Sequence, residues 1–518
     1  KMTLKEKILQ TFIVTVREIN KHGGPKEFFE KYPVGGMYYS VLPGAEDTVE
    51  MGTGTSYKRL CECRKYSKVP LLVCADGAGI TGAKYSCGPS ALVSSKNLKD
   101  AYDYGKLLGM QMNFHGVDWL LGPSVDLLYD RSMPLYAASD DPKLTAKVYS
   151  EVVRGLQDQG VCATLKHFPG LGTNSINMHF GHGRNVLDFD EWMNSYGYLY
   201  KELFKTSPLS VMTTHVSLKS YTDEYENGYY PIATYSKRLT NDLLKEELGF
   251  EGAVVTDALI MGGMATGNLI EETVQAFKSG ADLLLWPPVE AADRIEELIL
   301  SGEIPESRLD EALLRIQKMR DFRNKALKEK KYEEPTAEKA DEISKRVTAH
   351  GICEYKNEIG LLPLNTDKVK NILIVNAAEN ENSKAASNLA DALNKAGFNA
   401  EVKRDIYDVP SRVCWQDDID ELQSKYDLTI FSMSMDYATS WSVSFMMVWA
   451  FQLFDKNKKL IINYGSPFFA EDYFAEEHTI VEVNNGADEK TVELLVERLL
   501  GKEPFTGTKI LTEHTKKI

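Results

Sequence analysis

The sequence predicts an α/β protein in which a (β/α)8 barrel of the TIM type is followed by a smaller α/β sandwich. Three observations predict this fold class. The chain has 518 residues, too many for one compact core. Short apolar runs alternate with amphipathic segments through about residue 330, which is typical of a parallel sheet. The runs are apolar throughout, as expected for strands that are covered on both faces.

The first expected element is a helix over residues 2–14, with Thr3 as N-cap and Glu6 three residues later. The apolar runs predict strands within 33–40, 69–76, 116–128, 160–168, 208–216, 250–259 and 280–287. Amphipathic helices are expected over 142–160, 236–249 and 270–280. About eight such units fit before residue 330, which favours a closed barrel. An open doubly wound sheet is the alternative.

A highly charged, periodic stretch over 323–351 is typical of a helix and separates two domains. We therefore expect the barrel over 1–325, a helical linker over 326–368 and the α/β sandwich over 369–518. In this last domain the strand–helix alternation resumes, with apolar runs at 369–380, 426–434 and 459–467.

The composition excludes several classes of protein. The net charge of −15 is spread along the chain, which argues against a nucleic-acid or anionic-membrane surface. Seven scattered cysteines fit neither a disulfide framework nor a C-x-x-C zinc motif, and they favour a reducing, cytoplasmic compartment. No apolar run reaches the roughly 20 residues that span a bilayer, and no signal peptide is visible. The start at Lys1–Met2 leaves a removed leader open, and nothing indicates an oligomeric state.

Polar side chains stand at the ends of several predicted strands. They are Asp76, Asp126, His167, His215 and Asp257. In a barrel the carboxyl ends of the strands form the active-site face. Burying charged groups without a use is costly, so packing alone does not explain five of them.

Asp257 stands in "VVTDALIMGGM", at the end of a β-rich run and before a glycine-containing loop. A carboxylate placed this way suits nucleophilic attack or electrostatic stabilisation. It equally suits the N-cap of the following helix, and the local pattern leaves both readings open.

The segment 164–183, "TLKHFPGLGTNSINMHFGHG", is rich in histidine and glycine. Its proline and glycines predict a sharp turn after Lys166 and His167. His179 and His182 follow later in the same segment. An imidazole on such a loop suits general acid/base catalysis. Histidines that only cap turns are the alternative. A metal site is not predicted, because no acidic or sulfur ligand stands at a characteristic spacing.

These segments resemble glycoside hydrolase family 3, and within it the two-domain bacterial β-N-acetylglucosaminidases. Residues 166–179, "KHFPGLGTNSINMH", are similar to the family pattern K-H-F-P-G-H-G-(x)4-D-x-H. Residues 248–264, "LGFEGAVVTDALIMGGM", resemble its nucleophile segment, and "VMTTHV", "PIATYSKRL", "GADLLLWP" and "EYKNEIGLLPL" also match. The resemblance runs from the first helix to near the C-terminus.

The resemblance implies a retaining glycosidase without a cofactor, acting on a small carbohydrate or glycoside. Asp257 would be the nucleophile and His179 the acid/base. The residues that match sugar-gripping positions are Asp76, Lys166, His167 and His215. Aromatic rings stack on sugars, and Trp119, Trp286 and Tyr136 lie near strand ends. Trp286 is the best of the three, with core filling as its alternative.

The chain departs from the family pattern at three places. The Asp two residues before the catalytic His is Asn177, which orients the ring but adds no charge. The His of "P-G-H-G" is Leu171, and "YAASDDP" (136–142) lacks the family's sugar-binding Arg, with Arg131 nearby but displaced. In the β-glucosidase branch the second domain supplies a Glu, and here Asp436 is a candidate whose alternative is a turn cap.

We therefore expect a retaining, exo-acting β-glycosidase for β-N-acetylglucosaminides or a related β-glycoside, through a covalent glycosyl-Asp257 intermediate. The alternatives are a glycoside phosphorylase and a catalytically impaired sugar-binding homologue.

Overall fold

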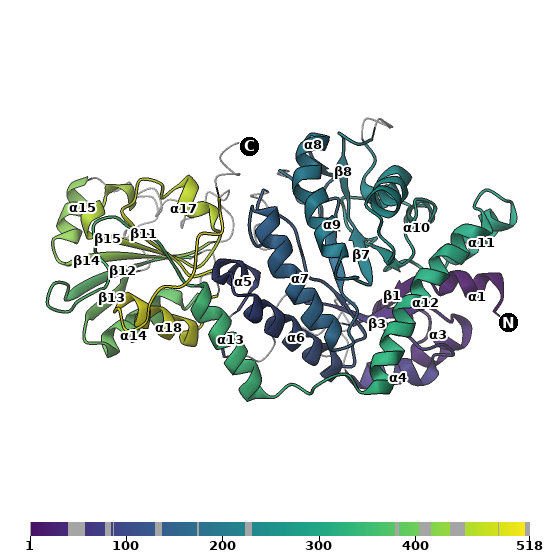
Figure 1. Cartoon of the computed structure of the whole chain (residues 1–518), viewed down its shortest axis with the longest axis horizontal. Coiled ribbons are helices and arrows are strands. Elements are labelled where there is room, and N and C mark those ends of the chain that lie inside the picture. Colours follow the sequence, from purple (N-terminus) through teal and green to yellow (C-terminus); the bar gives the residue numbers. More distant parts are fainter. Residues whose placement is uncertain are drawn as a thin grey trace. The chain divides into compact units, whose positions relative to one another are not determined.

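The computed structural model describes residues 2–39, 57–77, 84–85, 87–129, 137–173, 176–222, 230–378, 383–403, 416–435, 451–484 and 486–512. By its contacts the chain divides into two compact units. The first comprises Lys1–Thr81, Ala101–Ser132 and Thr145–Thr336, and the second comprises Gly82–Asp100, Met133–Leu144 and Ala337–Ile518. Figure 1 shows the elements of both units.

The first unit is built on parallel strands. One sheet has five strands in the order β10-β1-β2-β3-β4, and another has three in the order β5-β7-β9. Their bounds are β1 Phe12–Val14, β2 Gly36–Tyr38, β3 Leu72–Asp76, β4 Trp119–Leu121, β5 Thr164–Phe168, β7 Ser210–Thr213, β9 Ala253–Thr256 and β10 Leu284–Leu285. A further parallel pair joins β6, Gly183–Asn185, to β8, Val216–Leu218. The predicted parallel α/β class is confirmed.

Single parallel bridges connect the two larger sheets. Trp119 of β4 pairs with Cys162, just before β5, and Ser124, just after β4, pairs with Lys166 of β5. Val255 of β9 pairs with Leu283, just before β10. These are isolated bridges and not continuous ladders. Closure into one eight-stranded barrel therefore stays a prediction.

The helices of the first unit alternate with these strands. They are α1 Leu4–Leu9, α2 Val16–Lys21, α3 Pro25–Lys31, α4 Tyr57–Tyr66, α6 Leu98–Phe114, α7 Pro142–Asp158, α8 Phe189–Trp192, α9 Tyr198–Phe204, α10 Leu269–Lys278, α11 Ala291–Leu300 and α12 Glu306–Glu329, with the π-helices η2 Met193–Gly197 and η4 Arg238–Glu247 and the 3-10 turn η3 Ala233–Tyr235. Within the described residues, no helix is both long and apolar enough to cross a membrane.

The helix expected over residues 2–14 is too long. The predicted cap is confirmed, because Thr3 and Glu6 form a reciprocal capping box at the start of α1. The helix nevertheless ends at Leu9, and Phe12–Val14 form the buried strand β1. An apolar run this short fits both helical spacing and a buried strand, so periodicity could not separate them.

The second unit contains a six-stranded mixed sheet in the order β11-β16-β15-β14-β12-β13, in which only the β11–β16 pairing is antiparallel. Its strands are β11 Cys353–Asn357, β12 Asn371–Ala378, β13 Asn399–Lys403, β14 Leu428–Ser434, β15 Lys459–Asn463 and β16 Thr479–Glu482. Its helices are α5 Pro89–Ser95, α13 Ala337–Gly351, α14 Ala385–Lys395, α15 Gln416–Gln423, α17 Phe468–Asp472 and α18 Glu489–Leu499, with the 3-10 turns η5 Phe451–Leu453 and η6 Lys456–Lys458.

Alternation along the strands gives this sheet two apolar faces. In β12, Ile372 and Ile374 pack in one core with α14 and α18, while Leu373 and Val375 pack in another with residues of α15 and α17. Figure 1 shows these helix pairs on opposite sides of the sheet. The range 326–368, expected as a linker, contains the end of α12, α13 and β11.

Candidate active site

The sheet register brings Asp257 next to the strand-end residues of β7. Thr213 of β7 pairs with Thr256 of β9, and the N–H of Asp257 donates to the carbonyl of Thr213 at 2.8 Å. Since the strands are parallel, their carboxyl ends meet at one edge. Thr214, the first residue after β7, therefore lies beside Asp257.

Both carboxylate oxygens of Asp257 accept a hydrogen bond. The hydroxyl of Thr214 donates to Oδ2 at 2.7 Å, and the N–H of Ala258 donates to Oδ1 at 2.8 Å. Burial alone raises the pKa of this carboxyl. The electrostatic interactions with His215 and His167 and the two hydrogen bonds outweigh burial, so the pKa of Asp257 lies below its ordinary value. The group is an ionised, nearly buried carboxylate at neutral pH.

His215 is fully buried, and the protein occupies both of its ring nitrogens. Nε2 lies 3.1 Å from the carbonyl of Ala258, and Nδ1 lies 2.8 Å from the hydroxyl of Thr234. A carbonyl only accepts, so the neutral ring carries its proton on Nε2 and accepts at Nδ1. Burial is the main cause that lowers the pKa of His215. The sugar-gripping role of this histidine stays a prediction; the contacts seen here hold the backbone of Ala258, next to Asp257.

Asp126 fixes the turn after β5. Its Oδ2 lies 2.6 Å from Nδ1 of His167, and its Oδ1 accepts the N–H of Leu171 at 3.1 Å. Leu171, which stands where the family pattern has His, is buried. Gly170 and Gly172 adopt the left-handed backbone conformation, and a Cβ on Gly170 would lie 2.3 Å from the ring of Tyr196. The predicted turn is therefore tightly packed.

A second group of side chains joins β3, β5, β2 and β10. The buried ammonium of Lys166 donates to Asp76 Oδ1 at 2.8 Å, whereas the side chain of Asp76 is 54% exposed. Tyr38, at the end of β2, lies close to Asp76, and burial followed by this carboxylate raises the pKa of its phenol. The ring of Tyr38 meets Trp286 edge to face at 5.1 Å between centroids. Trp286 itself has a left-handed φ of 66°.

Asn177 orients the ring of His179. Its Oδ1 accepts the backbone N–H of His179 at 3.0 Å and lies 2.7 Å from Nδ1 of the same residue. Since a backbone N–H can only donate, this atom of Asn177 is an acceptor. The proton of the neutral imidazole therefore sits on Nδ1, and Nε2 carries the lone pair.

Backbone contacts hold the His179 loop against the loop that follows Asp257. The N–H of Gly262 donates to the carbonyl of His179 at 2.9 Å, and that of Gly263 donates to the carbonyl of Met178 at 3.0 Å. A Cβ on Gly263 would lie 2.2 Å from the Met178 carbonyl, so only glycine permits this approach. Sδ of Met178 also lies 2.8 Å from the Thr214 hydroxyl. The two loops are thus joined directly.

The other predicted aromatic and polar candidates have different positions. Trp119 is fully buried, and its indole N–H donates to Thr164 and Ser210, so it fills the core. Arg131, Tyr136 and Asp436 lie outside the described residues.

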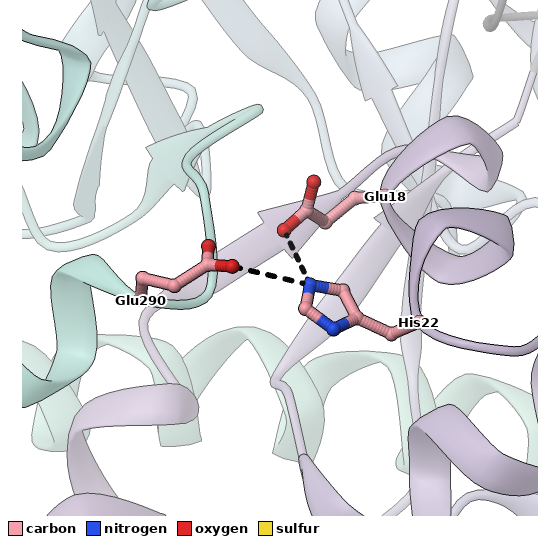
Figure 2. A group of neighbouring side chains, drawn as sticks. All are labelled: Glu18, His22 and Glu290. Atoms are coloured by element: carbon pink, nitrogen blue, oxygen red, sulfur yellow. Dashed lines mark hydrogen bonds and ion pairs between the residues drawn. The ribbon is translucent and has the colours of Figure 1, made fainter.

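The histidines of the loop do not form a metal-binding group within the described part of the chain. There, one set of three ligand-type side chains lies close together: Glu18, His22 and Glu290. Figure 2 shows both carboxylates turned towards Nε2 of His22, at 3.3 Å for Glu18 and 3.5 Å for Glu290. The ammonium of Lys21 lies 3.1 Å from Glu290 and 3.7 Å from Glu18. The Lys21 ammonium therefore already provides a cation for these two carboxylates. The cluster links the segments that follow β1 and β10.

The sequence pattern of the glycosyl hydrolase family 3 N-terminal domain matches residues 3–319. The chain belongs to glycosyl hydrolase family 3 and is thus a glycoside hydrolase by family. It is 25% identical over 391 residues to a beta-N-acetylglucosaminidase/beta-glucosidase from Cellulomonas fimi, covering 70% of this chain and 68% of the relative. It is 27% identical over 350 residues to the beta-hexosaminidase LpqI from Mycobacterium tuberculosis, covering 61% of this chain and 82% of the relative.

Two solved structures share the fold over the whole length. A beta-glucoside phosphorylase, BglX, superposes with a TM-score of 0.81 at 21% identity, covering 100% of this chain and 95% of that one. A family 3 beta-N-acetylglucosaminidase from Paenibacillus superposes with a TM-score of 0.78 at 21% identity, covering 99% of each chain.

Proposed function

We propose that this chain is a retaining, exo-acting β-glycosidase for β-N-acetylglucosaminides or a related β-glycoside. The observation that carries the proposal is the ionised carboxylate of Asp257, held by Thr214 and Ala258 at a strand end and joined by contacting loops to His179. The names of the curated relatives support the choice of sugar. We also take the two parallel sheets as arcs of one eight-stranded barrel, because the single bridges place β5 beside β4 and β10 beside β9.

In the first step Asp257 attacks the anomeric carbon. A bond forms between that carbon and a carboxylate oxygen, and the bond to the glycosidic oxygen breaks. The leaving oxygen takes the proton from Nε2 of the protonated His179 ring. The hydrogen bonds from Thr214 and Ala258 keep the carboxylate ionised and aimed, and each oxygen retains a lone pair for the attack.

In the second step the neutral His179 ring acts as a base. Its Nε2 takes a proton from water, the resulting hydroxyl bonds to the anomeric carbon, and the ester bond to Asp257 breaks. Two displacements at one carbon retain its configuration. Asn177 keeps the proton of the neutral ring on Nδ1, so the lone pair needed for this step is at Nε2.

The sugar is gripped by the groups at the neighbouring strand ends. The Lys166–Asp76 pair supplies a charged donor and a charged acceptor for hydroxyls, and His167 supplies an imidazole ring nitrogen. Trp286 and Tyr38 supply aromatic surface for the C–H faces of the ring.

The test is turnover of an aryl β-N-acetylglucosaminide by Asp257→Asn. We expect the rate to fall by at least about 10³-fold, because the amide cannot form the covalent intermediate. Asp190→Asn, an exposed change on α8, is the matched control and should leave the rate unchanged. Normal turnover by purified, folded Asp257→Asn would overturn the assignment.

A glycoside phosphorylase is the second candidate, favoured by one observation. The group beside His179 Nδ1 is a neutral amide, so no carboxylate repels an incoming phosphate there. One of the structures that share the fold is a beta-glucoside phosphorylase. Product analysis with and without millimolar phosphate separates the two: a glycosyl phosphate identifies a phosphorylase, and free sugar alone identifies a hydrolase.

A catalytically impaired sugar-binding homologue is the remaining alternative, motivated by Asn177 and Leu171. A glycoside that raises the melting temperature without any turnover would support it. A covalent sugar adduct on Asp257 would eliminate it.

A further inference from the structure

A groove of about 990 Å³ lies beside the loop that carries His179. Its wall includes Phe180, Gly181 and His182, the three residues that follow His179. It also includes Gly262, whose N–H donates to the carbonyl of His179. The groove, here called the basic groove, thus begins one residue away from the proposed acid/base and is large enough for a small organic ligand.

The described lining of the basic groove is opposite in charge to the whole chain. The net charge is −15, yet none of the described residues that line the groove is acidic. Arg184 and Lys237 line it, and neither forms an ion pair with any described acidic side chain. A third cation, the ammonium of Lys219, lies 5.5 Å from the ring centre of Tyr230, another lining residue. These charges create a positive local field.

The other charged groups of the described residues near the groove have partners of their own. Lys278 lines it but is paired with Glu303 at 2.7 Å. The carboxylate of Glu272 approaches the lining residue Thr266, where it accepts from the hydroxyl at 2.8 Å and from the N–H of Gly267 at 3.1 Å. Burial, and then the charge of Arg184, lowers the pKa of His182, so that ring is neutral at neutral pH. Of the described lining cations, Arg184 and Lys237 are therefore the two without an acidic partner.

Part of the lining of the basic groove is apolar and aromatic. Phe180 is 84% exposed and Ile176 is 38% exposed, although both are large apolar side chains. Tyr230 and Tyr235 form part of the lining, and the hydroxyl of Tyr235 donates to the carbonyl of Met264 at 3.0 Å, which fixes its ring. Such surfaces pack against a sugar or aryl ring while the cations hold an anionic substituent.

We propose that the basic groove binds an oxyanion on the leaving-group side of the reaction. The inference rests on the proposed function, because a general acid lies next to the leaving oxygen and the groove continues from that acid. The shared chemistry is a carboxylate or phosphate held by Arg184 and Lys237. Its two sources are an aglycone that carries the anion and free inorganic phosphate that replaces the aglycone.

The experiment compares wild type with an Arg184→Gln/Lys237→Gln variant and with Lys325→Gln, an exposed control on α12 outside the groove. The substrates are 4-nitrophenyl β-N-acetylglucosaminide and its 3-carboxy-4-nitrophenyl analogue, each with and without about 1 mM inorganic phosphate, the upper end of common KM values. The measured quantity is the ratio of the two kcat/KM values in each variant, because comparing this ratio between variants cancels the difference in leaving-group reactivity.

We expect the double variant to lose about tenfold in kcat/KM for the carboxylated substrate, equal to about 1.4 kcal/mol, with the neutral substrate and Lys325→Gln unchanged. Added salt should weaken the preference in wild type. If a glycosyl phosphate forms and its yield depends on Arg184 and Lys237, the source is free phosphate. An unchanged ratio together with phosphate effects equal in all variants overturns the proposal.

If wild type turns over neither substrate, the proposed glycosidase function is wrong. The proposal for the basic groove is then tested by binding alone. The melting temperature is then measured with each glycoside. A larger rise with the carboxylated compound in wild type but not in the double variant supports the basic groove, and equal rises in both overturn it.

Discussion

The two halves of the proposed catalytic pair are held in opposite ways. Asp257 lies at the end of a buried strand, and hydrogen bonds from Thr214 and Ala258 reach both of its oxygens. His179 is exposed, and its position depends on a side-chain contact to Asn177 and on backbone hydrogen bonds from Gly262 and Gly263. The nucleophile is thus fixed by the core, whereas the acid/base is fixed by one loop lying on another. Changes at the two places should therefore have different consequences.

Among changes that keep both Asp257 and His179, the largest effect is expected where the loops touch. Gly263→Ala places a methyl group 2.2 Å from the carbonyl of Met178, so the loop that carries His179 must move. A displacement of about 1 Å at a reacting group costs roughly 10²-fold in rate, and we expect a loss of that size in kcat. The melting temperature should fall as well, because Gly263 and Met178 are buried and the clash involves backbone.

The check is kcat alongside the melting temperature. Gly88→Ala, where the added Cβ meets nothing within 4 Å, is the steric control and should leave kcat unchanged. Full activity in Gly263→Ala would show that these backbone contacts do not position His179.

The next largest effect is expected at the nucleophile. Thr214→Val keeps the shape of the side chain but removes the donor to Asp257 Oδ2. The pKa of Asp257 should rise, because a hydrogen bond to the charged form is lost, and the acidic limb of the kcat/KM profile should move to higher pH. A loss of about tenfold at neutral pH is expected for one hydrogen bond to a charged group. If the acidic limb stays at the same pH, the hydrogen bond from Thr214 does not lower the pKa of Asp257.

A smaller effect is expected at Asn177. Asn177→Asp adds a negative charge at the atom that lies 2.7 Å from His179 Nδ1. An adjacent carboxylate favours the protonated ring, so the basic limb of the pH profile should move to higher pH, with a rate change of only a few-fold at neutrality. Any phosphate-dependent activity should decline at the same time. If pH–rate profiles of the variant and wild type coincide, the contact to Asn177 has no catalytic role.

The smallest effect concerns stability. The pKa of His215 is lowered in the folded protein, so the unfolded chain binds this proton first as the pH falls. Its contribution to stability is therefore present above the unfolded pKa of about 6.5 and declines as the pH falls below it. Urea unfolding between pH 7 and 5 should show a shallower decline for His215→Gln than for wild type. Parallel curves would contradict this sign.

Much of the fold could be predicted because buried parallel strands leave a local signature. The runs that became β3, β9 and β12 are largely apolar stretches, and each lies within its expected range. The assignment of residues 12–14 to a helix was wrong because tertiary pairing with β2 and β10 decided it. The membership of α5 in the second unit likewise depends on contacts with α13, distant in sequence, such as the hydrogen bond from Ser94 to Gly351.

In the candidate site, too, residues with a local sequence signal were predicted, and residues placed by strand pairing were not. Asp257, His167 and Lys166 were visible because they end apolar runs. Thr214 was not singled out, because its contact with Asp257 follows from the register of β7 on β9. Tyr38 was missed for a similar reason: β2 and β10 flank β1, and only that strand order brings Tyr38 to Trp286. Residue type and spacing carry no information about such cross-strand partners.

The central claim is that the carboxylate of Asp257 forms the covalent intermediate. Incubation with a fluorosugar that slows the second step, followed by proteolysis and peptide mass measurement, tests it directly. We expect one sugar to be attached to the peptide that contains Asp257 in wild type and none in Asp257→Asn. A sugar attached to a different carboxylate, or none attached while wild type turns over an aryl glycoside, would contradict the account.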